Sequence, residues 1–80
     1  MKIIRKLFYN ENTKVYSVEL GESNKEVTFT IDDVKSLNTY INYYGYTFCY
    51  ITLINNEYYL CSAEETKQGV ILRELLEQLD

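Results

Sequence analysis

The stretch from Tyr46 to Ser62 constrains the fold of this chain most strongly. It reads YTFCYITLINNEYYLCS, two runs rich in β-branched and aromatic residues on either side of Asn55-Asn56. Such runs are typical of β-strands, and asparagine tolerates the positive φ angles that a two-residue hairpin turn needs. The stretch therefore predicts a β-hairpin, and its apolar character favours a place in the middle of a sheet.

The predicted turn decides which side chains share a face of this hairpin. If Asn55 and Asn56 form the turn, Ile54 lies opposite Glu57, and side chains alternate between faces along each strand. The core face then carries Cys49, Ile51, Leu53, Tyr58 and Leu60, and the outer face carries Phe48, Tyr50, Thr52, Ile54, Glu57, Tyr59 and Cys61. Because the cysteines lie on opposite faces, we expect two thiols and no disulfide. A register slip of one residue would exchange the faces of one strand.

Residues 2–31 predict a three-stranded meander. Segments 2–9 and 15–20 flank the polar turn 10–13, and segment 26–31 follows a polar loop. Apolar and polar residues alternate in the second and third segments, which is the period of a strand with one buried face. Pairing Tyr9 with Lys14 gathers the apolar residues on one face: Ile3, Leu7, Tyr16, Val18, Leu20, Val27 and Phe29.

Two further segments carry the spacing of amphipathic helices. The first follows Thr30, a helix-capping residue type, and reaches Gly45; its apolar residues are Val34, Leu37, Ile41 and Tyr44. In the second, Ser62 and Glu65 match a capping box. We expect this helix to span residues 63–79, with Ile71, Leu72, Leu75, Leu76 and Leu79 on its buried side.

Gly69 is unfavourable inside the second helix by about 1 kcal/mol relative to alanine. The helix either bends there or begins near Gly69 after a looser turn, and we favour one continuous helix. The predicted order is β-β-β-α-β-β-α. This is an α+β fold with a five-stranded, mainly antiparallel sheet and two helices packed on one face.

Size and composition predict a single domain over residues 1–80. The basic segment 1–9 is not followed by an apolar region long enough for a signal peptide, and no run approaches the ~20 apolar residues of a membrane span. Thiols without a targeting segment favour a cytoplasmic protein with no membrane contact.

The residue types that usually carry catalysis are scarce. The chain has no histidine, its two cysteines lack a CxxC spacing, and its three glycines stand apart. Asp32-Asp33 and Glu64-Glu65 lie where predicted helices begin, a position that favours carboxylates for structural reasons. We therefore expect no catalytic residue, no metal and no cofactor.

Charge and tyrosine content predict a binding surface instead. The net charge of −4 resides in residues 57–80, whose acids are Glu57, Glu64, Glu65, Glu74, Glu77 and Asp80. Nine tyrosines in 80 residues are unusual, and aromatic rings are enriched at protein interfaces. The predicted partner-binding residues are Tyr50, Tyr59, Glu57, Glu64, Glu65, Glu74 and Glu77.

A short, acidic chain without proline or histidine resembles, in composition alone, small proteins of phages and other mobile elements. The resemblance implies a non-enzymatic inhibitor of a host nucleic-acid-handling enzyme, such as a defence nuclease or a CRISPR effector. Carboxylates would then occupy a basic channel of the protein partner. Two alternatives are a nucleic-acid-binding regulator that uses the tyrosines of its sheet and a homodimeric structural accessory domain.

Overall fold

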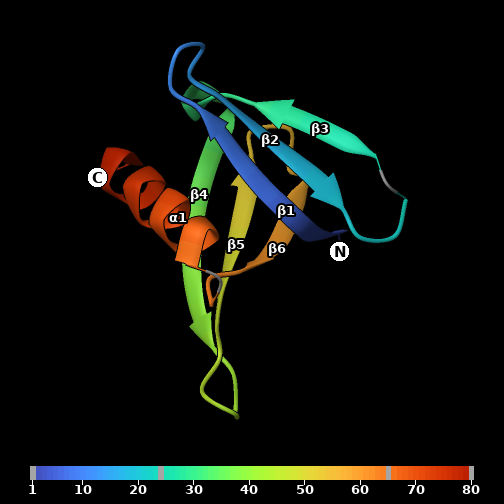
Figure 1. Cartoon of the computed structure of the whole chain (residues 1–80), viewed down its shortest axis with the longest axis vertical. Coiled ribbons are helices and arrows are strands. Elements are labelled where there is room, and N and C mark those ends of the chain that lie inside the picture. Colours follow the sequence, from blue (N-terminus) through green and yellow to red (C-terminus); the bar gives the residue numbers. More distant parts are fainter. Residues whose placement is uncertain (1, 24, 65, 80) are drawn as a thin grey trace.

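The structure is a computed structural model that describes residues 2–23, 25–64 and 66–79. It contains, in chain order, β1 (Lys2–Asn10), β2 (Val15–Leu20), β3 (Glu26–Phe29), the 3-10 turn η1 (Ile31–Asp33), β4 (Val34–Ile41), β5 (Thr47–Leu53), β6 (Tyr58–Ser62) and α1 (Thr66–Leu79) (Figure 1). Within these ranges, no helix is long and apolar enough to cross a membrane.

The strands form one six-stranded sheet in the order β3-β2-β1-β6-β5-β4. Neighbouring strands are antiparallel except β1 and β6, which run parallel, so the sheet is mixed. The α+β class agrees with the prediction. The predicted five strands and two helices are wrong in detail, because the described ranges contain six strands, one 3-10 turn and one α-helix.

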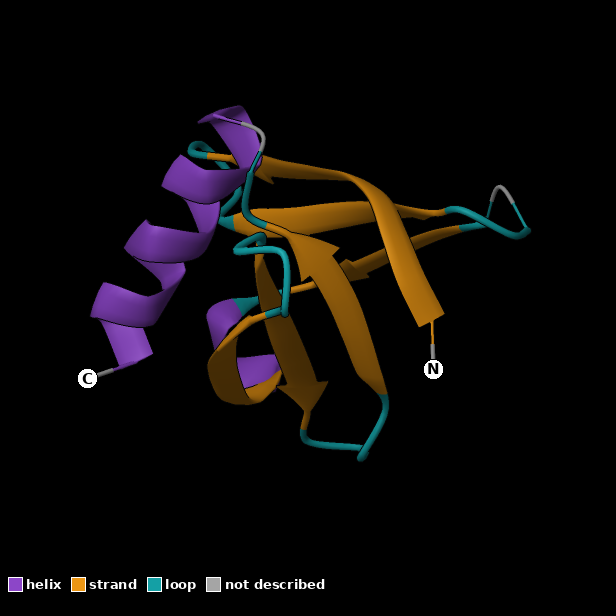
Figure 2. Ribbon diagram, turned by 90° about the horizontal axis from the view of Figure 1, so that it is seen from below, coloured by secondary structure: helices purple, strands orange, loops and turns teal. Residues whose placement is uncertain are grey.

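The sheet is strongly curled. Strands β3 and β4 lie at opposite edges, yet only residues 30–33 join them. The edges of a flat six-stranded sheet are about 24 Å apart, whereas five residue steps of extended chain span at most about 18 Å. The two halves of the sheet, β1–β2–β3 and β4–β5–β6, therefore cross at an angle around the buried face (Figures 1 and 2).

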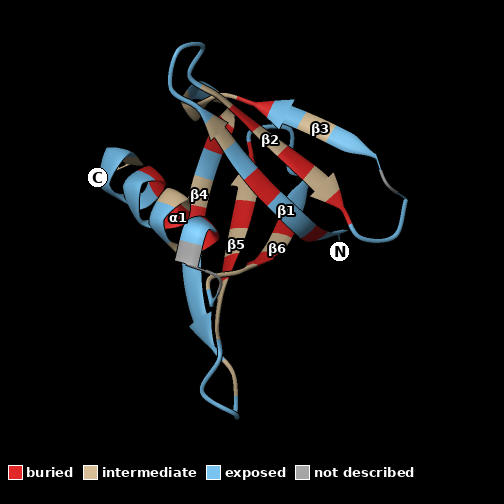
Figure 3. Ribbon diagram, in the orientation of Figure 1, coloured by how far each residue is buried: buried red, intermediate tan, exposed pale blue. Residues whose placement is uncertain are grey.

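The core lies inside this curl. Helix α1 packs against β1, β4 and η1 and contributes Leu72 and Leu75. The other buried apolar residues come from the sheet: Ile4, Leu7, Tyr16, Val18, Leu20, Phe29, Val34, Leu37, Cys49, Ile51, Leu53, Tyr59 and Cys61 (Figure 3). The sequence predicted one apolar face covered by two helices, whereas in the described residues one α-helix covers it.

The N-terminal meander is confirmed, with a different register. Tyr9 pairs with Tyr16 rather than with Lys14, which lies in the turn with a φ of 60°. A shift of two residues leaves every side chain of β2 on its predicted face. An irregularity in β1 between Ile4 and Lys6 buries Ile4 in place of the predicted Ile3.

The predicted helix up to Gly45 is wrong: its residues form η1 and β4. The turn at its start does occur, since the backbone N–H of Thr30 donates to Oδ2 of Asp33 at 2.9 Å. A register shift between Val34 and Ser36 then places Val34 and Leu37 on the same buried face. The bulge therefore produced the spacing of three that resembled a helix.

The central hairpin is confirmed, but its register differs by one residue. The loop has three residues, closed by hydrogen bonds from Leu53 N to Glu57 O at 2.8 Å and from Asn56 N to Leu53 O at 2.9 Å. Asn56 has a φ of 69°, as in a type I turn with a bulge. All of β6 consequently faces the opposite way from the prediction, with Tyr59 and Cys61 buried.

This slip also corrects the placement of the cysteines. Cys49 and Cys61 are direct cross-strand partners and share the buried face, rather than lying on opposite faces. Both are thiols in the structure. Cys61 Sγ lies 3.6 Å from the Nε2 donor of Gln68, which also donates to the backbone oxygen of Ser62 at 3.1 Å. The buried Gln68 thus ties α1 to the end of β6.

Helix α1 begins at Thr66 rather than near residue 63 and continues through Gly69. A Cβ at Gly69 would lie 2.9 Å from the backbone oxygen of Ala63, so this glycine allows the helix to approach the preceding segment closely. Of the predicted stripe, Leu72 and Leu75 are buried and Leu76 is 37% exposed. The predicted capping box depends on Glu65, which lies outside the described residues.

Candidate functional site

The outer surface formed by residues 36–41 of β4 together with β5 and β6 is free of charge. Strand alternation and the observed pairing turn one set of side chains away from the core: Ser36, Asn38, Tyr40, Phe48, Tyr50, Thr52, Tyr58, Leu60 and Ser62. We call this set the aromatic face. It lies on the side of the sheet opposite α1, whose Leu72 approaches Leu37 and Cys49 on the inner side. A quarter of the chain is charged, but no member of this set is.

The rings of the aromatic face are close neighbours. Tyr40 is the cross-strand partner of Phe48, and its ring centroid lies 6.2 Å from that of Tyr50 in an edge-on arrangement. Tyr40 and Tyr58 are each about half exposed, at 48% and 50%. Edge-to-face contact holds the rings in defined orientations. Depletion of charge together with exposed aromatic rings is typical of the centre of a protein interface.

The β4–β5 connection continues this surface into an ordered loop, residues 42–46, which we call the tyrosine loop. Oδ1 of Asn42 accepts hydrogen bonds from Tyr44 N at 2.9 Å and Tyr46 N at 3.0 Å. Gly45 supplies the positive φ, 87°, that the turn requires. Tyr43 and Tyr44 are 96% and 80% exposed at the tip, which extends away from the core (Figures 1 and 3).

The structure places the two predicted tyrosines differently. Tyr50 lies in the aromatic face, as expected, and is half-buried. Tyr59 was predicted to be on the outer face, and that is wrong, because its exposed fraction is 0%. Tyr58 takes the outer position instead. The sequence analysis missed Tyr58 and Tyr40. A three-residue loop at Ile54–Asn56 would have placed Tyr58 on the outer face, and a strand in place of the first predicted helix would have placed Tyr40 there.

The predicted acidic residues do not gather at the aromatic face. Glu74 and Glu77 are exposed on α1, on the other side of the sheet. Glu57 and Glu64 are exposed beyond opposite ends of β6. Glu65 lies outside the described residues. The single surface of tyrosines and carboxylates that the sequence predicted is therefore divided between separate parts of the molecule.

The carboxylate of Glu57 contacts Tyr59 and Lys2. Its Oε2 accepts a hydrogen bond from the Tyr59 hydroxyl at 2.7 Å and lies 3.7 Å from Nζ of Lys2. The same Nζ lies 5.7 Å from the centroid of the Tyr59 ring. The hydroxyl of a buried tyrosine needs such an acceptor, so Glu57 stabilises the fold.

These contacts predict a pH dependence. The Tyr59 hydrogen bond, followed by the charge of Lys2, lowers the pKa of Glu57 below its ordinary value of 4.5. Burial, followed by the hydrogen bond to Glu57, raises the pKa of Tyr59 to about 12. The stabilisation through Glu57 is present above pH 4.5 and lost as the pH falls through its lowered pKa. The stabilisation through neutral Tyr59 is complete below about pH 10 and lost as the pH rises through about 12.

Urea unfolding of the wild type and of Glu57→Gln between pH 3 and pH 8 checks the loss of stability in acid. We expect the wild type to be the more stable at pH 7 and the two to converge in acid. A difference that stays constant with pH would contradict this assignment. Absorbance titration checks the raised pKa of Tyr59. The tyrosine that ionises at the highest pH in the wild type should be missing from the titration of Tyr59→Phe.

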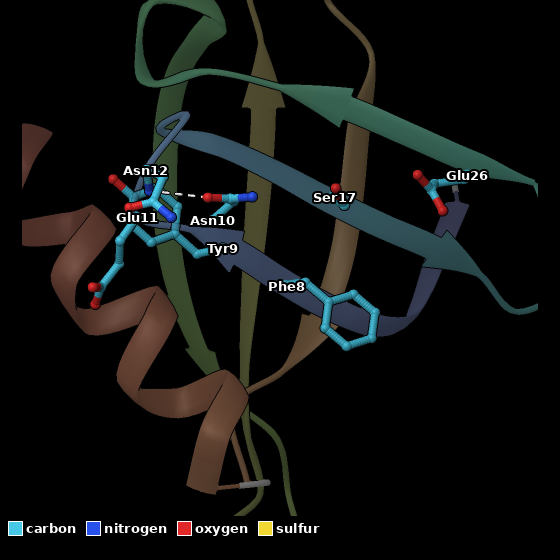
Figure 4. Close-up of a pocket in the computed structure, with 7 residues that line it drawn as sticks. All are labelled: Phe8, Tyr9, Asn10, Glu11, Asn12, Ser17 and Glu26. Carbon is cyan, nitrogen blue, oxygen red and sulfur yellow. Dashed lines mark hydrogen bonds between the residues drawn. The ribbon is translucent and has the colours of Figure 1, made fainter.

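A hollow lies on the other half of the sheet, β1–β2–β3 (Figure 4). It is an open depression of about 580 Å³ lined by Phe8, Tyr9, Asn10, Glu11, Asn12, Ser17 and Glu26. Glu11 and Glu26 lie at opposite ends of it, and Oδ1 of Asn10 is occupied by the backbone N–H of Asn12 at 2.9 Å. Among the described residues, no group of three or more histidine, cysteine or acidic side chains is placed to hold a metal ion. The aromatic face is thus the stronger candidate site.

Comparisons of the chain with protein-family models, with curated proteins and with solved structures found no match.

Proposed function

We propose that this protein is a non-enzymatic protein-binding module whose partner docks on the aromatic face. The observation that carries the proposal is the charge-free outer surface of residues 36–41 of β4, of β5 and of β6, with the rings of Tyr40, Phe48, Tyr50 and Tyr58 on it. The core of a protein interface is depleted in charge and enriched in tyrosine and phenylalanine. Tyrosine is also among the residues that contribute most to binding energy.

Preorganisation supports the same function. The Tyr40–Tyr50 ring contact and the hydrogen bonds of Asn42 hold the rings and the tyrosine loop before a partner arrives. Ordering an interface side chain on binding costs about 0.5–1.5 kcal/mol, so an ordered surface loses less free energy on association. The exposed rings are therefore suited to act as anchors in pockets of the partner.

The partner class that fits the remaining charge is a basic protein that handles nucleic acid. The chain carries a net charge of −4, and Glu74 and Glu77 are exposed on α1. At a distance from the aromatic face, the net negative charge of the chain would steer association rather than form the contact, which raises the rate of encounter at low salt. Blocking a host enzyme of this class is the finer form of the proposal.

Capture from a host lysate, followed by binding measurements with the purified partner, tests the proposal. Tyr58→Ala should weaken binding by about 30-fold or more, the effect of losing an interface anchor worth about 2 kcal/mol. Phe8→Ala is the matched control. Phe8 is also an aromatic residue that is 50% exposed, but it lies on β1 and lines the hollow shown in Figure 4. We expect this variant to leave the affinity within about twofold.

Two results would overturn the proposal. Equal losses for Tyr58→Ala and Phe8→Ala would show that the aromatic face has no special role. Salt-sensitive binding to single-stranded nucleic acid that depends on Tyr50 and Tyr58 would assign the rings to base stacking instead.

A further inference from the structure

Strand β4 is an open edge of the sheet. Among the described residues it pairs with β5 alone. The hydrogen bond from Asn42 N to Tyr46 O at 2.9 Å marks a hydrogen-bonded pair next to the tyrosine loop. Such pairs alternate along an antiparallel ladder, so every second residue of β4 turns its N–H and C=O away from β5. The outward-turned residues are Leu37, Thr39 and Ile41.

Residues 36–41 of this edge lack the sequence features that usually prevent strand pairing. Residues 36–41 contain no charged residue and no proline, and the bulge in β4 lies before them. The opposite edge, β3, is only four residues long and begins with Glu26 directly after Lys25. Charges, short length and bulges are the means by which natural sheets protect their edges. These features are therefore present at β3, and in β4 they are confined to the first residues, so residues 36–41 lack them.

We propose that a second copy of this chain pairs with β4, antiparallel and about a twofold axis at Thr39. Thr39 then lies opposite Thr39 of the second copy, and Leu37 lies opposite Ile41 of the second copy. Each of these pairs exchanges two backbone hydrogen bonds, so the outward-turned groups of all three residues are satisfied. The two sheets become one continuous sheet across the axis.

Charge and side-chain pairing favour a second copy as the occupant. A twofold axis brings each residue near it close to its own equivalent, so a charged edge would repel itself. Residues 36–56 are uncharged in a chain whose net charge is −4, and β4 is the sheet edge within them. The pairing also covers Ile41, which is 65% exposed, with the apolar side chain of Leu37 from the second copy. Asn38 of one copy comes beside Tyr40 of the other, which joins the two aromatic faces.

Sedimentation equilibrium over micromolar to high micromolar concentrations tests the pairing. The wild type should reach twice its chain mass of 9.5 kDa. Thr39→Pro removes an outward-turned N–H without removing a bond to β5, and a proline is tolerated at such an edge position. We expect it to raise the dimer dissociation constant by about 10- to 100-fold, because each dimer loses two backbone hydrogen bonds.

Thr28→Pro is the matched control. Thr28 is an exposed threonine in β3, the other edge strand. The hydrogen bond from Leu20 N to Lys25 O marks a hydrogen-bonded pair, and such pairs alternate, so Val27 and Phe29 are bonded to β2. The N–H of Thr28, which lies between them, therefore points outward. We expect Thr28→Pro to leave the dimer unchanged. If Thr39→Pro does not fold by circular dichroism, Thr39→Lys replaces it, since two lysines would then face each other across the axis and weaken the dimer similarly.

A wild type that stays monomeric at high micromolar concentration would overturn the pairing. Equal effects of the variants at positions 39 and 28, or a dimer that is lost with Tyr58→Ala instead, would also overturn it. The pairing does not rest on the proposed function: Thr39→Pro reports on self-association, whereas Tyr58→Ala reports on partner binding.

Discussion

Tyr59→Ala is expected to lower the free energy of unfolding by about 3–5 kcal/mol, the usual loss for a fully buried aromatic ring. Tyr59 is 0% exposed, and its hydroxyl is bonded to Glu57. Tyr58→Ala, one residue earlier in the same strand, should cost about 0.5 kcal/mol or less because Tyr58 is half exposed. Total stabilities of small domains are about 5–15 kcal/mol, so the first variant should lose a large fraction of the total and the second only a small one.

Urea unfolding at pH 7, followed by circular dichroism, measures both losses. The pair of variants reports on the register of the central hairpin, because a two-residue turn would bury Tyr58 and expose Tyr59. A larger loss for Tyr58→Ala than for Tyr59→Ala would contradict the three-residue loop. Tyr59→Phe separates the two contributions, since it keeps the ring and removes only the hydrogen bond to Glu57.

Gly69→Ala is expected to destabilise the protein by about 1–3 kcal/mol, the usual cost of inserting a methyl group into a packed site. Helix propensity alone predicts the opposite sign, because alanine is favoured over glycine by about 1 kcal/mol in a helix. The new Cβ would lie 2.9 Å from the backbone oxygen of Ala63, and a backbone atom cannot move aside as the end of a side chain can.

Gly21→Ala is the matched control for this variant. A Cβ at Gly21 would meet its nearest atom, the backbone oxygen of Ile3, at 3.7 Å, which is ordinary van der Waals contact. We expect Gly21→Ala to be neutral or stabilising by up to about 1 kcal/mol, through the unfolded state. Stabilisation by Gly69→Ala in urea unfolding would show that α1 does not approach Ala63 as closely as the structure has it.

Bulges explain where prediction from the sequence failed. In β1 the buried residues Ile4 and Leu7 are three positions apart, and in β4 Val34 and Leu37 have the same spacing. Both spacings span an irregularity in the pairing, at Ile4/Lys6 and Val34/Ser36. A bulge inserts one residue into a period of two, and the resulting period of three is locally indistinguishable from that of a helix. For this reason the residues of β4 were predicted to be a helix, and Tyr40 of the candidate site was missed.

The candidate site could be predicted only in part. The sequence predicted a binding role for the tyrosine-rich hairpin, which stays a prediction, and placed Tyr50 on its outer face, where the structure has it. The prediction placed Tyr59 instead of Tyr58 on the outer face, because one extra residue in the loop turns every side chain of β6 to the opposite face. The described acids Glu57, Glu64, Glu74 and Glu77 come from one part of the sequence but are separated in space, because the first two lie beyond opposite ends of β6 and the others lie on α1 (Figure 1).

Local patterns in the chain were sufficient for the α+β class, the N-terminal meander, the central hairpin and the C-terminal helix, because alternation and helical spacing act over a few neighbouring residues. Only the tertiary structure decided the register of the hairpin, the strand character of Val34–Ile41 and the parallel pairing of β1 with β6. Those features depend on hydrogen bonds and packing between residues far apart in the sequence. A short link between opposite edges then forces the sheet to curl, and α1 covers the inner side of that curl while the aromatic face lies on the outer side.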